Sequence, residues 1–379
     1  MHIAFLTTEY PHGKTGRYGG IGTSIKNAAE ALVTAGSSAS IFVISQKEST
    51  ILEENGITIH LIAQRKYKFM SWFFYKKYVQ RYINEKIKNQ QIDILETPDW
   101  SGISALMNFD CPVVIRFNGS DAYFCELEGR KQKPKNFWLE KTALRGADHF
   151  ISVSQFTAAR TRKLFQLKKE ITIIPNSVDV KQFTPRPEME EEHRLLYFGT
   201  LIRKKGVLDL AEIFNKIVEK APKTTFFLAG NDVIDLKTGK STQKLMEEIL
   251  SPQAMKNIHF LGKLDYDQVQ EEIAKATVIL LPSHAEALPM TWLEAMAMEK
   301  ALVTSDIGWA KEVMVNGTTG FTVEPNNHDL FAEKTLELLD NKKLRETMGK
   351  AAREQVTAHF SANVIAKKNL DFYKKSCST

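Results

Sequence analysis

Short apolar runs alternate along the chain with longer segments in which apolar positions recur at helical spacing, such as residues 23–35. In the first half the runs cover residues 2–8, 39–44, 92–96, 113–117 and 149–153. In the second half they cover residues 194–198, 225–229, 258–261, 278–281, 301–304 and 320–323. Strands that alternate with helices form parallel sheets through right-handed βαβ units. The pattern therefore predicts an α/β chain with two Rossmann-like domains.

A polar break separates the two sets of strands. Residues 183–193 contain Pro185, Pro187 and a run of acids, which disfavour packed structure. We therefore expect a domain at 1–183, a linker at 184–193 and a second domain at 194–358. Ligands of such sheets bind at the carboxyl ends of the strands, which is where candidate site residues are sought.

Glu286 and Glu294 lie eight residues apart, on either side of a loop-to-helix junction that follows an apolar run. Pro289 fits the first turn of that helix, where its missing N–H costs nothing. The amides of Leu288 and Met290 would then point out of the helix start, where a phosphate binds readily. A phosphate flanked by hydroxyl-rich groups, as in a nucleotide-sugar, fits this arrangement. The alternative is that the two acids belong to an ordinary helix surface.

The residues around this pair resemble the family 4 retaining glycosyltransferases. The matching residues are Pro282-Ser283, Glu286, Glu294-Ala-Met-Ala, Ala301-Leu-Val-Thr-Ser, Gly317, and Gly320-Phe-Thr-Val with Pro325, and the resemblance is densest from about residue 170 to 330. It implies the GT-B fold, in which two Rossmann-like domains face each other across a cleft and a C-terminal helix, here within 359–379, returns to the N-terminal domain. It also implies that Glu286 meets the donor sugar, that Glu294 accepts hydrogen bonds from ribose, and that Ala287 belongs to the donor pocket.

A second segment, residues 198–206, is a candidate source of the cation that a departing diphosphate needs. Fixed cations stabilise a leaving diphosphate most strongly in a dry site. The family has an Arg after the glycine that ends a strand and a Lys just before a second glycine. Lys205, followed by Gly206, matches the Lys, but Thr200 stands after Gly199 where the Arg is expected. Arg203 is a candidate replacement; the alternative is a solvated basic turn.

The first strand leads into a glycine-rich segment, residues 13–22. Glycines let a backbone approach a ligand closely, and the helix start that follows is electropositive. The segment resembles the family's first loop, which implies donor contact at Gly20 and acceptor contact at Arg17 and Tyr18. A glycine-rich turn without a ligand is the alternative.

Three further strand ends carry weaker candidates. Asn118 stands near the place where many family members have a donor-contacting His, and Asp121 is a candidate for orienting the donor or contacting the acceptor. A helix N-cap at Ser120 or Asp121 is the competing interpretation. Glu96 and Asp99 are candidates for acceptor hydroxyls. Gly230 and Leu264 match turns beside the nucleotide, although plain turn chemistry would also explain them.

Composition indicates an ordinary soluble protein, with 43% hydrophobic and 25% charged residues. The three cysteines have no metal-type spacing, and the first residues resemble a strand rather than a signal peptide. No apolar stretch approaches the roughly 18 residues that span a bilayer. We therefore expect a cytoplasmic protein.

The net charge of +6 is concentrated in residues 65–88, which hold eight basic residues, one acid and eight aromatic residues. One interpretation is a half-buried helix with solvated lysines. The other is peripheral contact with an anionic membrane, here the inner membrane face. No motif for nucleic acid accompanies the segment, so no nucleic-acid partner is expected.

Together these features predict retaining transfer of a hexosyl group from a nucleotide diphosphate sugar to a glycan or lipid-linked glycan, of the cell-surface polysaccharide type. No Asp-any-Asp pair has a suitable setting, so we expect no catalytic metal and no cofactor. Two alternatives stay open: a non-catalytic partner or chaperone subunit of the same fold, favoured by Thr200 and Asn118, and a sugar-nucleotide epimerase.

Overall fold

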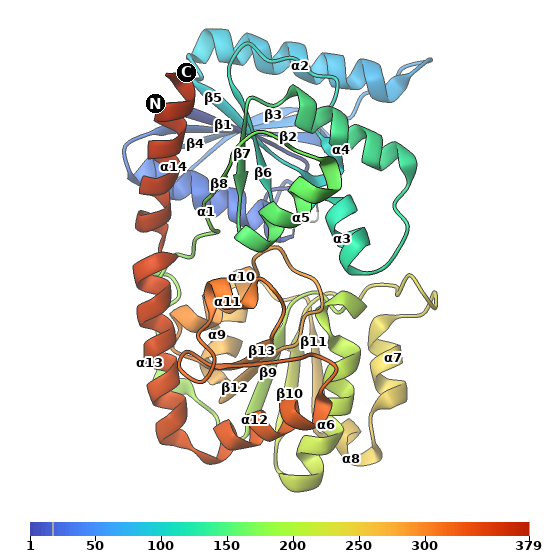
Figure 1. Ribbon diagram of the computed structural model, residues 1–379, viewed down its shortest axis with the longest axis vertical. Helices are drawn as coiled ribbons and strands as arrows, with labels where there is room; N and C mark the ends of the chain where they lie inside the picture. The colour runs from blue at the N-terminus through green and yellow to red at the C-terminus, as the bar shows by residue number, and fades with distance from the viewer. Residues whose placement is uncertain (17–18, 379) are drawn as a thin grey trace. The chain divides into compact units, whose positions relative to one another are not determined.

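The computed structural model describes residues 1–16 and 19–378 and contains two compact units (Figure 1). The first comprises Met1–Ser177 with Ala362–Thr379, and the second comprises Val178–Ser361. The units divide at Ser177 and Ser361, a few residues from the expected boundaries at 183 and 358. Among the described residues, every helix is too short or too polar to cross a lipid bilayer.

The first unit has an eight-stranded sheet with the order β3-β4-β2-β1-β5-β6-β7-β8. Its strands are β1 (His2–Thr7), β2 (Ser38–Gln46), β3 (Thr50–Glu54), β4 (Ile57–Ala63), β5 (Ile94–Pro98), β6 (Val113–Phe117), β7 (His149–Ser152) and β8 (Ile171–Ile173). Every described pairing is parallel except β3 with β4. That hairpin was missed by the sequence analysis, although Asn55-Gly56, both with positive φ, is a strong hairpin-turn signal.

Helices cover both faces of this sheet. They are α1 (Gly20–Thr34), α2 (Ser71–Gln90), α3 (Asp121–Leu127), α4 (Pro134–Gly146), α5 (Gln155–Phe165) and α14 (Ala362–Cys377). Successive residues of β1 point to opposite faces, so Ile3 and Phe5 pack in one core cluster and Ala4 and Leu6 in another. Helices α1 and α14 contribute to the first cluster and α2 to the second.

The second unit has a six-stranded parallel sheet with the order β11-β10-β9-β12-β13-β14. Its strands are β9 (Arg194–Phe198), β10 (Thr225–Ala229), β11 (Ile258–Gly262), β12 (Val278–Leu281), β13 (Ala301–Ser305) and β14 (Phe321–Val323). Its helices are α6 (Val207–Lys220), α7 (Thr242–Ile249), α8 (Pro252–Asn257), α9 (Tyr266–Lys275), α10 (Met290–Ala297), α11 (Ala310–Val313), α12 (His328–Asp340) and α13 (Lys342–His359).

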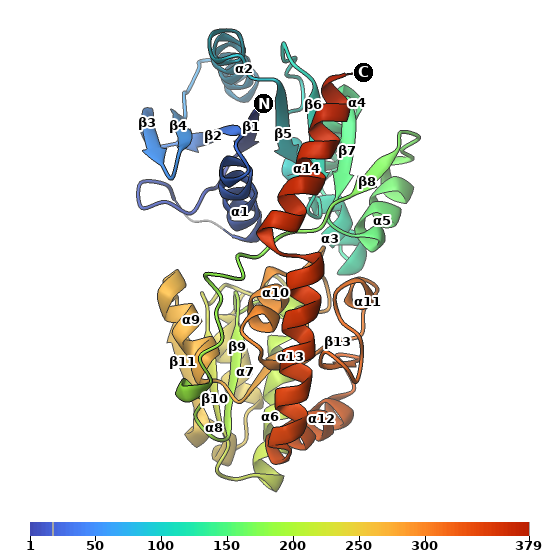
Figure 2. The ribbon, with the colours of Figure 1, turned by 90° about the vertical axis from the view of Figure 1, so that its left-hand side faces the viewer.

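Two parallel-sheet α/β units confirm the predicted fold class. The return of the C-terminal helix is also confirmed, because α14 packs beside α1 in the first unit (Figure 2). Residues 362–377 therefore complete a core cluster whose other buried members all precede residue 175 in the sequence.

Candidate functional site

Two connections at the carboxyl end of the second sheet meet at one place. Strand β9 runs through Gly199 into a single 3-10 turn, Arg203–Lys205, before α6, and β12 runs through residues 282–289 into α10. His284 N–H donates to the Lys204 carbonyl oxygen at 2.8 Å, which ties the second connection to the first. Contact between residues about eighty positions apart thus follows from the neighbouring positions of β9 and β12 in the sheet.

Gly206 makes this contact close. Its φ of 72° lies in the left-handed region, and a Cβ there would stand 2.0 Å from the Pro282 carbonyl oxygen. Any side chain at Gly206 would therefore push the two connections apart. The sequence analysis used Gly206 only to recognise the motif. The structure explains why a glycine is needed there: no side chain would fit.

Lys205 and Glu286 form an ion pair in this position, between Nζ and Oε1. Ser283 Oγ donates to the same carboxylate oxygen at 2.9 Å. The side chains are 22% and 11% exposed, so the pair is sheltered but reachable. The structure therefore brings together the cation and the acid that the sequence analysis named separately. The sequence analysis did not predict that Ser283 contacts Glu286. Its position three residues before Glu286 could have indicated the contact.

Glu294 lies inside α10 and is buried. Tyr266 donates its hydroxyl to Glu294 Oε1 at 2.9 Å. Burial raises the pKa of this carboxyl to about 7, against the effects of Tyr266 and of the charge on Lys205. A carboxyl that is half protonated near neutral pH can accept or donate a hydrogen bond to a hydroxyl group. Tyr266, at the start of α9, is a second contact that the sequence analysis missed.

The start of α10 corrects one detail. Pro289 is the N-cap with extended backbone angles, and the helix begins at Met290, so the proline precedes the first turn instead of lying in it. This N-cap makes no side-chain cap hydrogen bond, and the first turn carries no acid. Ala287 and Leu288 are buried in the connection before it. A helix start of this kind favours an anion.

The other donor candidates of the second unit also line the carboxyl edge of its sheet. Gly230 follows β10, and a Cβ there would stand 1.8 Å from the Gly199 carbonyl oxygen after β9. Leu264 lies between β11 and α9, two residues before Tyr266. The backbone of these turns therefore lies at the strand ends where Lys205 and Glu286 meet.

Arg203 makes a bidentate pair with Asp235, with nitrogen–oxygen distances of 2.9 and 3.0 Å. The hydrogen bonds from Arg203 lower the pKa of Asp235, which is buried. Thr200 is exposed. The guanidinium that was expected to replace the missing family Arg at Thr200 is therefore held by Asp235, a partner that the sequence did not indicate.

In the first unit, Glu96 and Arg116 form a fully buried ion pair. Arg116 donates to both carboxylate oxygens, at 2.7 and 2.9 Å, and Tyr373 of α14 donates to Oε2 at 2.6 Å. Arg116 also donates to Asn369 at 2.8 Å. Both Glu96 oxygens are thus used inside the unit, an arrangement that favours a structural role over the acceptor contact expected from sequence.

Asp99 is buried beside Asn118, whose backbone N–H donates to Oδ1 at 3.0 Å. Burial raises the pKa of Asp99 well above its usual value. Its Oδ2 has no hydrogen-bond partner among the described residues. Of the two acceptor candidates, Glu96 in β5 and Asp99 directly after it, Asp99 is therefore the one with an unused polar atom.

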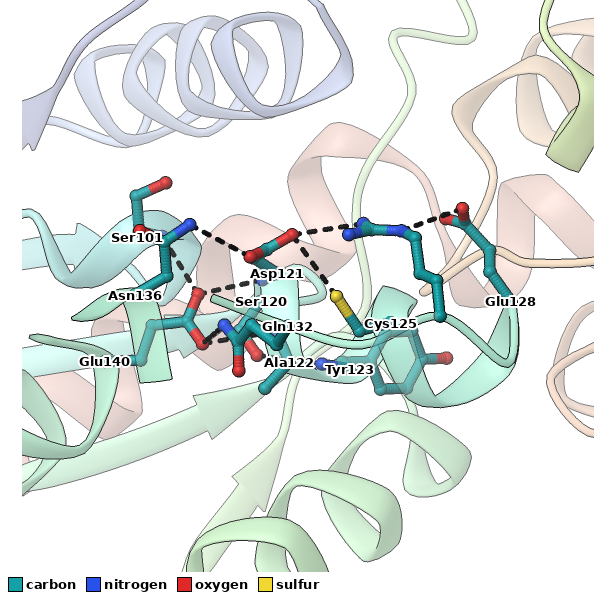
Figure 3. A network of polar contacts seen from close by, with 11 residues as sticks. Ser101, Ser120, Asp121, Ala122, Tyr123, Cys125, Glu128, Gln132, Asn136 and Glu140 are labelled. Carbon is teal, nitrogen blue, oxygen red and sulfur yellow. Dashed lines mark hydrogen bonds and ion pairs between the residues drawn. The ribbon is translucent and has the colours of Figure 1, made fainter. Parts of the chain in front are cut away.

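Asp121 belongs to a polar network around the start of α3 (Figure 3). Its carboxylate accepts from Arg130 at 3.0 Å and from Asn136 at 3.1 Å. Ser120 is the N-cap, accepting from the Tyr123 N–H, so the capping interpretation is confirmed for Ser120. Glu140 accepts from the backbone N–H groups of Asp121 and Ala122 at 2.9 and 3.2 Å. This second carboxylate fills the anion-favouring helix start.

The start of α1 also meets a carboxylate of its own chain. The helix begins at Gly20, and Gly22 N–H donates to Glu9 Oε1 at 2.8 Å. A donor phosphate at Gly20 would therefore have to share this helix start with Glu9. Arg17 and Tyr18, the expected acceptor contacts, lie outside the described residues.

Two histidines near Glu286 share one aspartate, an arrangement that the sequence analysis did not predict. His284 and His328 hold the two carboxylate oxygens of Asp209, at 2.8 and 2.9 Å. Burial opposes the charge of Asp209, but the hydrogen bonds from the two histidines lower its pKa overall. Through this contact α6 and the start of α12 position the residue two places before Glu286.

Two family models match successive parts of the chain. The model described as Glycosyltransferase Family 4 matches residues 18–182, and the model described as Glycosyl transferases group 1 matches residues 180–355. Together the matches run from residue 18 to residue 355, which leaves out β1 and α14 of the first unit. The second match contains Lys205, Glu286 and Glu294.

Curated relatives and solved structures agree with these matches. Glycogen synthase of Mycobacterium tuberculosis is 24% identical and aligns with 98% of this chain and 94% of its own length. A Corynebacterium glutamicum enzyme named as a GDP-mannose-dependent mannosyltransferase acting on a phosphatidylinositol monomannoside is 25% identical over 68% of each chain. Sucrose-phosphate synthase of Thermosynechococcus elongatus superposes with a TM-score of 0.80 at 19% identity, covering 99% of this chain and 98% of its own. The Anabaena protein HepE, solved with UDP and glucose, gives 0.76 at 15% identity, with 99% and 100% covered.

Proposed function

The chain belongs to glycosyltransferase family 4 and is a hexosyltransferase of the GT-B fold, and we propose that it transfers a hexosyl group from a nucleotide diphosphate sugar to a hydroxyl of a glycan or lipid-linked glycan. Transfer proceeds with retention of anomeric configuration. The observation that carries the proposal is the Lys205–Glu286 pair beside the start of α10, with Glu294 inside that helix.

The second unit would hold the nucleotide, the diphosphate and the sugar of the donor. The start of α10 supplies amide N–H groups for a phosphate, and Glu294, with its pKa near neutrality, suits the ribose hydroxyls. Glu286 would meet the sugar. Lys205 would then exchange part of its contact with Glu286 for the departing diphosphate, where a fixed cation stabilises developing negative charge.

In the proposed reaction the acceptor hydroxyl attacks the anomeric carbon from the face that the diphosphate leaves. The bond from the anomeric carbon to the phosphate oxygen breaks as the bond to the acceptor oxygen forms. The acceptor proton passes to the departing phosphate oxygen, so no protein base is required. Asp99 of the first unit, with an unused carboxyl oxygen, is the candidate for acceptor contact.

The nucleotide and the sugar are open, because relatives are named for different donors and HepE was solved with UDP and glucose. A panel of UDP- and GDP-sugars should therefore be tested for thermal stabilisation and for slow donor hydrolysis. Ligand at 100 times its dissociation constant stabilises a protein by about 2.7 kcal/mol, enough to rank donors.

We expect one donor class to stabilise the protein and to release its sugar slowly to water with the original anomeric configuration, read by NMR before mutarotation. Glu286→Gln should keep nucleotide binding and lose hydrolysis. Absence of binding and hydrolysis with every donor would favour a non-catalytic subunit. Recovery of an epimerised nucleotide-sugar would favour an epimerase.

A further inference from the structure

The aromatic residues of the basic segment 65–88 fall into two groups with different surroundings. Tyr75 is buried and Tyr78 and Tyr82 are half-buried against the core of the first unit. The buried face of α2 continues at Val79, Ile83 and Ile87, at helical spacing. For this group the interpretation as a half-buried helix is correct.

The preceding group lies on the surface. Phe69 is 81% exposed, Met70 58%, Phe74 46% and Trp72 39%. Apolar side chains this large are rarely exposed together without a binding role. The turn that presents them includes Met70 in the left-handed region, with φ 42°, which is uncommon for a residue with a long side chain.

These side chains form one surface with part of α4. The rings of Tyr67 and Phe74 lie 5.8 Å apart, and Lys135 Nζ lies 5.5 Å from the Trp72 ring. Trp138, one turn after Lys135, is 50% exposed. We call residues 65–74 together with Lys135 and Trp138 the aromatic–basic patch.

The charge of the patch has one sign. Lys66, Lys68 and Lys135 are exposed, and residues 65–74 contain no acid. By contrast, Lys76 and Lys77 donate to backbone carbonyl oxygens of Ile103 and Leu106, at 2.6 and 2.7 Å. The lysines beyond the patch therefore hold the helix on its domain, while those within it face outward.

From this geometry we infer that the aromatic–basic patch docks on an anionic lipid surface. Exposed Phe and Trp side chains insert at the boundary between headgroups and acyl chains, and outward lysines are attracted by anionic headgroups. A lipid bilayer binds exposed aromatic rings and outward lysines at the same time. It also needs no defined pocket, which fits rings that are spread over the surface. None of the proposed donor residues belongs to the patch, so docking can fail without affecting donor chemistry.

Flotation of the full chain with unilamellar vesicles tests the inference. We expect binding to phosphatidylcholine vesicles that contain phosphatidylglycerol, weaker binding to phosphatidylcholine alone, and release by salt. Phe69→Ser should reduce the partition coefficient about tenfold, since it removes one inserting ring. The double variant Lys66→Glu with Lys68→Glu should reduce it tenfold or more, because each basic residue near the membrane contributes about fivefold.

Matched controls come from the second unit. Leu236 is 83% exposed and Lys223 and Lys237 are also exposed. Leu236→Ser, and Lys223→Glu with Lys237→Glu, change the same surface properties and should leave vesicle binding unchanged. Equal losses in patch and control variants would overturn the assignment to this patch.

Tryptophan quenching separates insertion from adsorption. Lipids brominated on the acyl chain should quench fluorescence of the bound protein, and Trp72→Phe with Trp138→Phe should remove most of that quenching. Absence of vesicle binding, or concentration-dependent self-association lost with Phe69→Ser, would overturn the inference. Donor hydrolysis in lipid-free buffer should be the same in all these variants, which keeps this test apart from that of the proposed function.

Discussion

Each compact unit has a glutamate paired with a cation. Glu96 and Arg116 lie within β5 and β6 of the first unit, whereas Lys205 and Glu286 lie in the connections that follow β9 and β12 of the second. The two pairs differ in what closes them. Glu96 and Arg116 are 3% and 6% exposed, and Tyr373 and Asn369 of α14 complete their hydrogen bonds. Lys205 and Glu286 are 22% and 11% exposed, and the additional hydroxyl comes from the nearby Ser283.

The difference shows why a charged residue in a strand, or just after one, does not by itself indicate a binding site. A buried pair whose lone pairs and protons are all used inside the protein contributes to folding, and loss of one partner leaves an uncompensated charge. A sheltered but reachable pair can exchange its partner for a ligand. The closed pair should therefore respond to mutation in stability, and the open pair in turnover.

The largest expected effect is on the closed pair. Arg116→Ala should reduce the free energy of unfolding by about 3–5 kcal/mol, because Glu96 remains buried without its partner. Equilibrium unfolding in urea measures this loss. The double variant Arg116→Met with Glu96→Gln should be less destabilised than Arg116→Ala. A loss below about 1 kcal/mol in Arg116→Ala would contradict the closed-pair interpretation.

The open pair should show the opposite behaviour. Lys205→Ala should lower kcat about 10²–10³-fold, as expected for removal of one group that stabilises transition-state charge. Its unfolding free energy should change by less than about 1 kcal/mol, since the pair is partly solvated. Lys204→Ala, in the same turn, is the matched control and should retain turnover. Near-normal kcat in Lys205→Ala would remove this lysine from the reaction.

Glu294 should couple stability to pH. Its pKa rises from 4.5 to about 7 on folding, so the unfolded carboxyl ionises first, and stability is lost as pH rises between these values. The cost above pH 7 is on the order of 3 kcal/mol, at about 1.4 kcal/mol for each pH unit. Glu294→Gln should therefore raise the melting temperature at alkaline pH and not near pH 4, while weakening donor binding. An equal shift at both pH values would show that the effect is not ionisation.

The smallest effect should come from Arg203, whose side chain is 36% exposed while that of Asp235 is 4% exposed. Arg203→Ala should cost less than about 1 kcal/mol of stability because solvent screens the pair. Held by Asp235, Arg203 should contribute less to kcat than Lys205. A loss of turnover in Arg203→Ala equal to that in Lys205→Ala would show that Arg203 does replace the Arg missing at Thr200.

The sequence analysis named both members of the open pair, although not their contact, because the signals for each residue are local. Lys205 lies directly before Gly206, Glu286 lies three residues before Pro289, and both acid and lysine follow apolar runs that the strand pattern detects. The meeting of two such connections follows from the adjacency of their strands in a doubly wound sheet. Tyr266 and Asp235 carry no comparable local signal, since Tyr266 reaches Glu294 from the start of α9 and Asp235 reaches Arg203 from another loop.

The surroundings of Glu96 could not be predicted from local sequence. The sequence pattern placed Glu96 at a strand end, where a binding residue would lie, but the residue lies inside β5. Tyr373, which closes the pair, is 277 positions away. Its surroundings depend on how α14 packs, which periodicity alone does not determine. The β3–β4 hairpin was missed because its outer strand, Thr50–Glu54, has no buried residue and therefore no apolar run to detect.

The place of α14 has a consequence for synthesis of the protein on the ribosome. Ile365 and Tyr373 belong to the core of the first unit, yet they are translated after the whole of the second unit. The second unit is continuous in sequence, so it can fold while the first still lacks one of its helices. We expect the nascent first unit to stay incomplete, with Arg116 and Glu96 uncovered, until the final helix emerges from the exit tunnel.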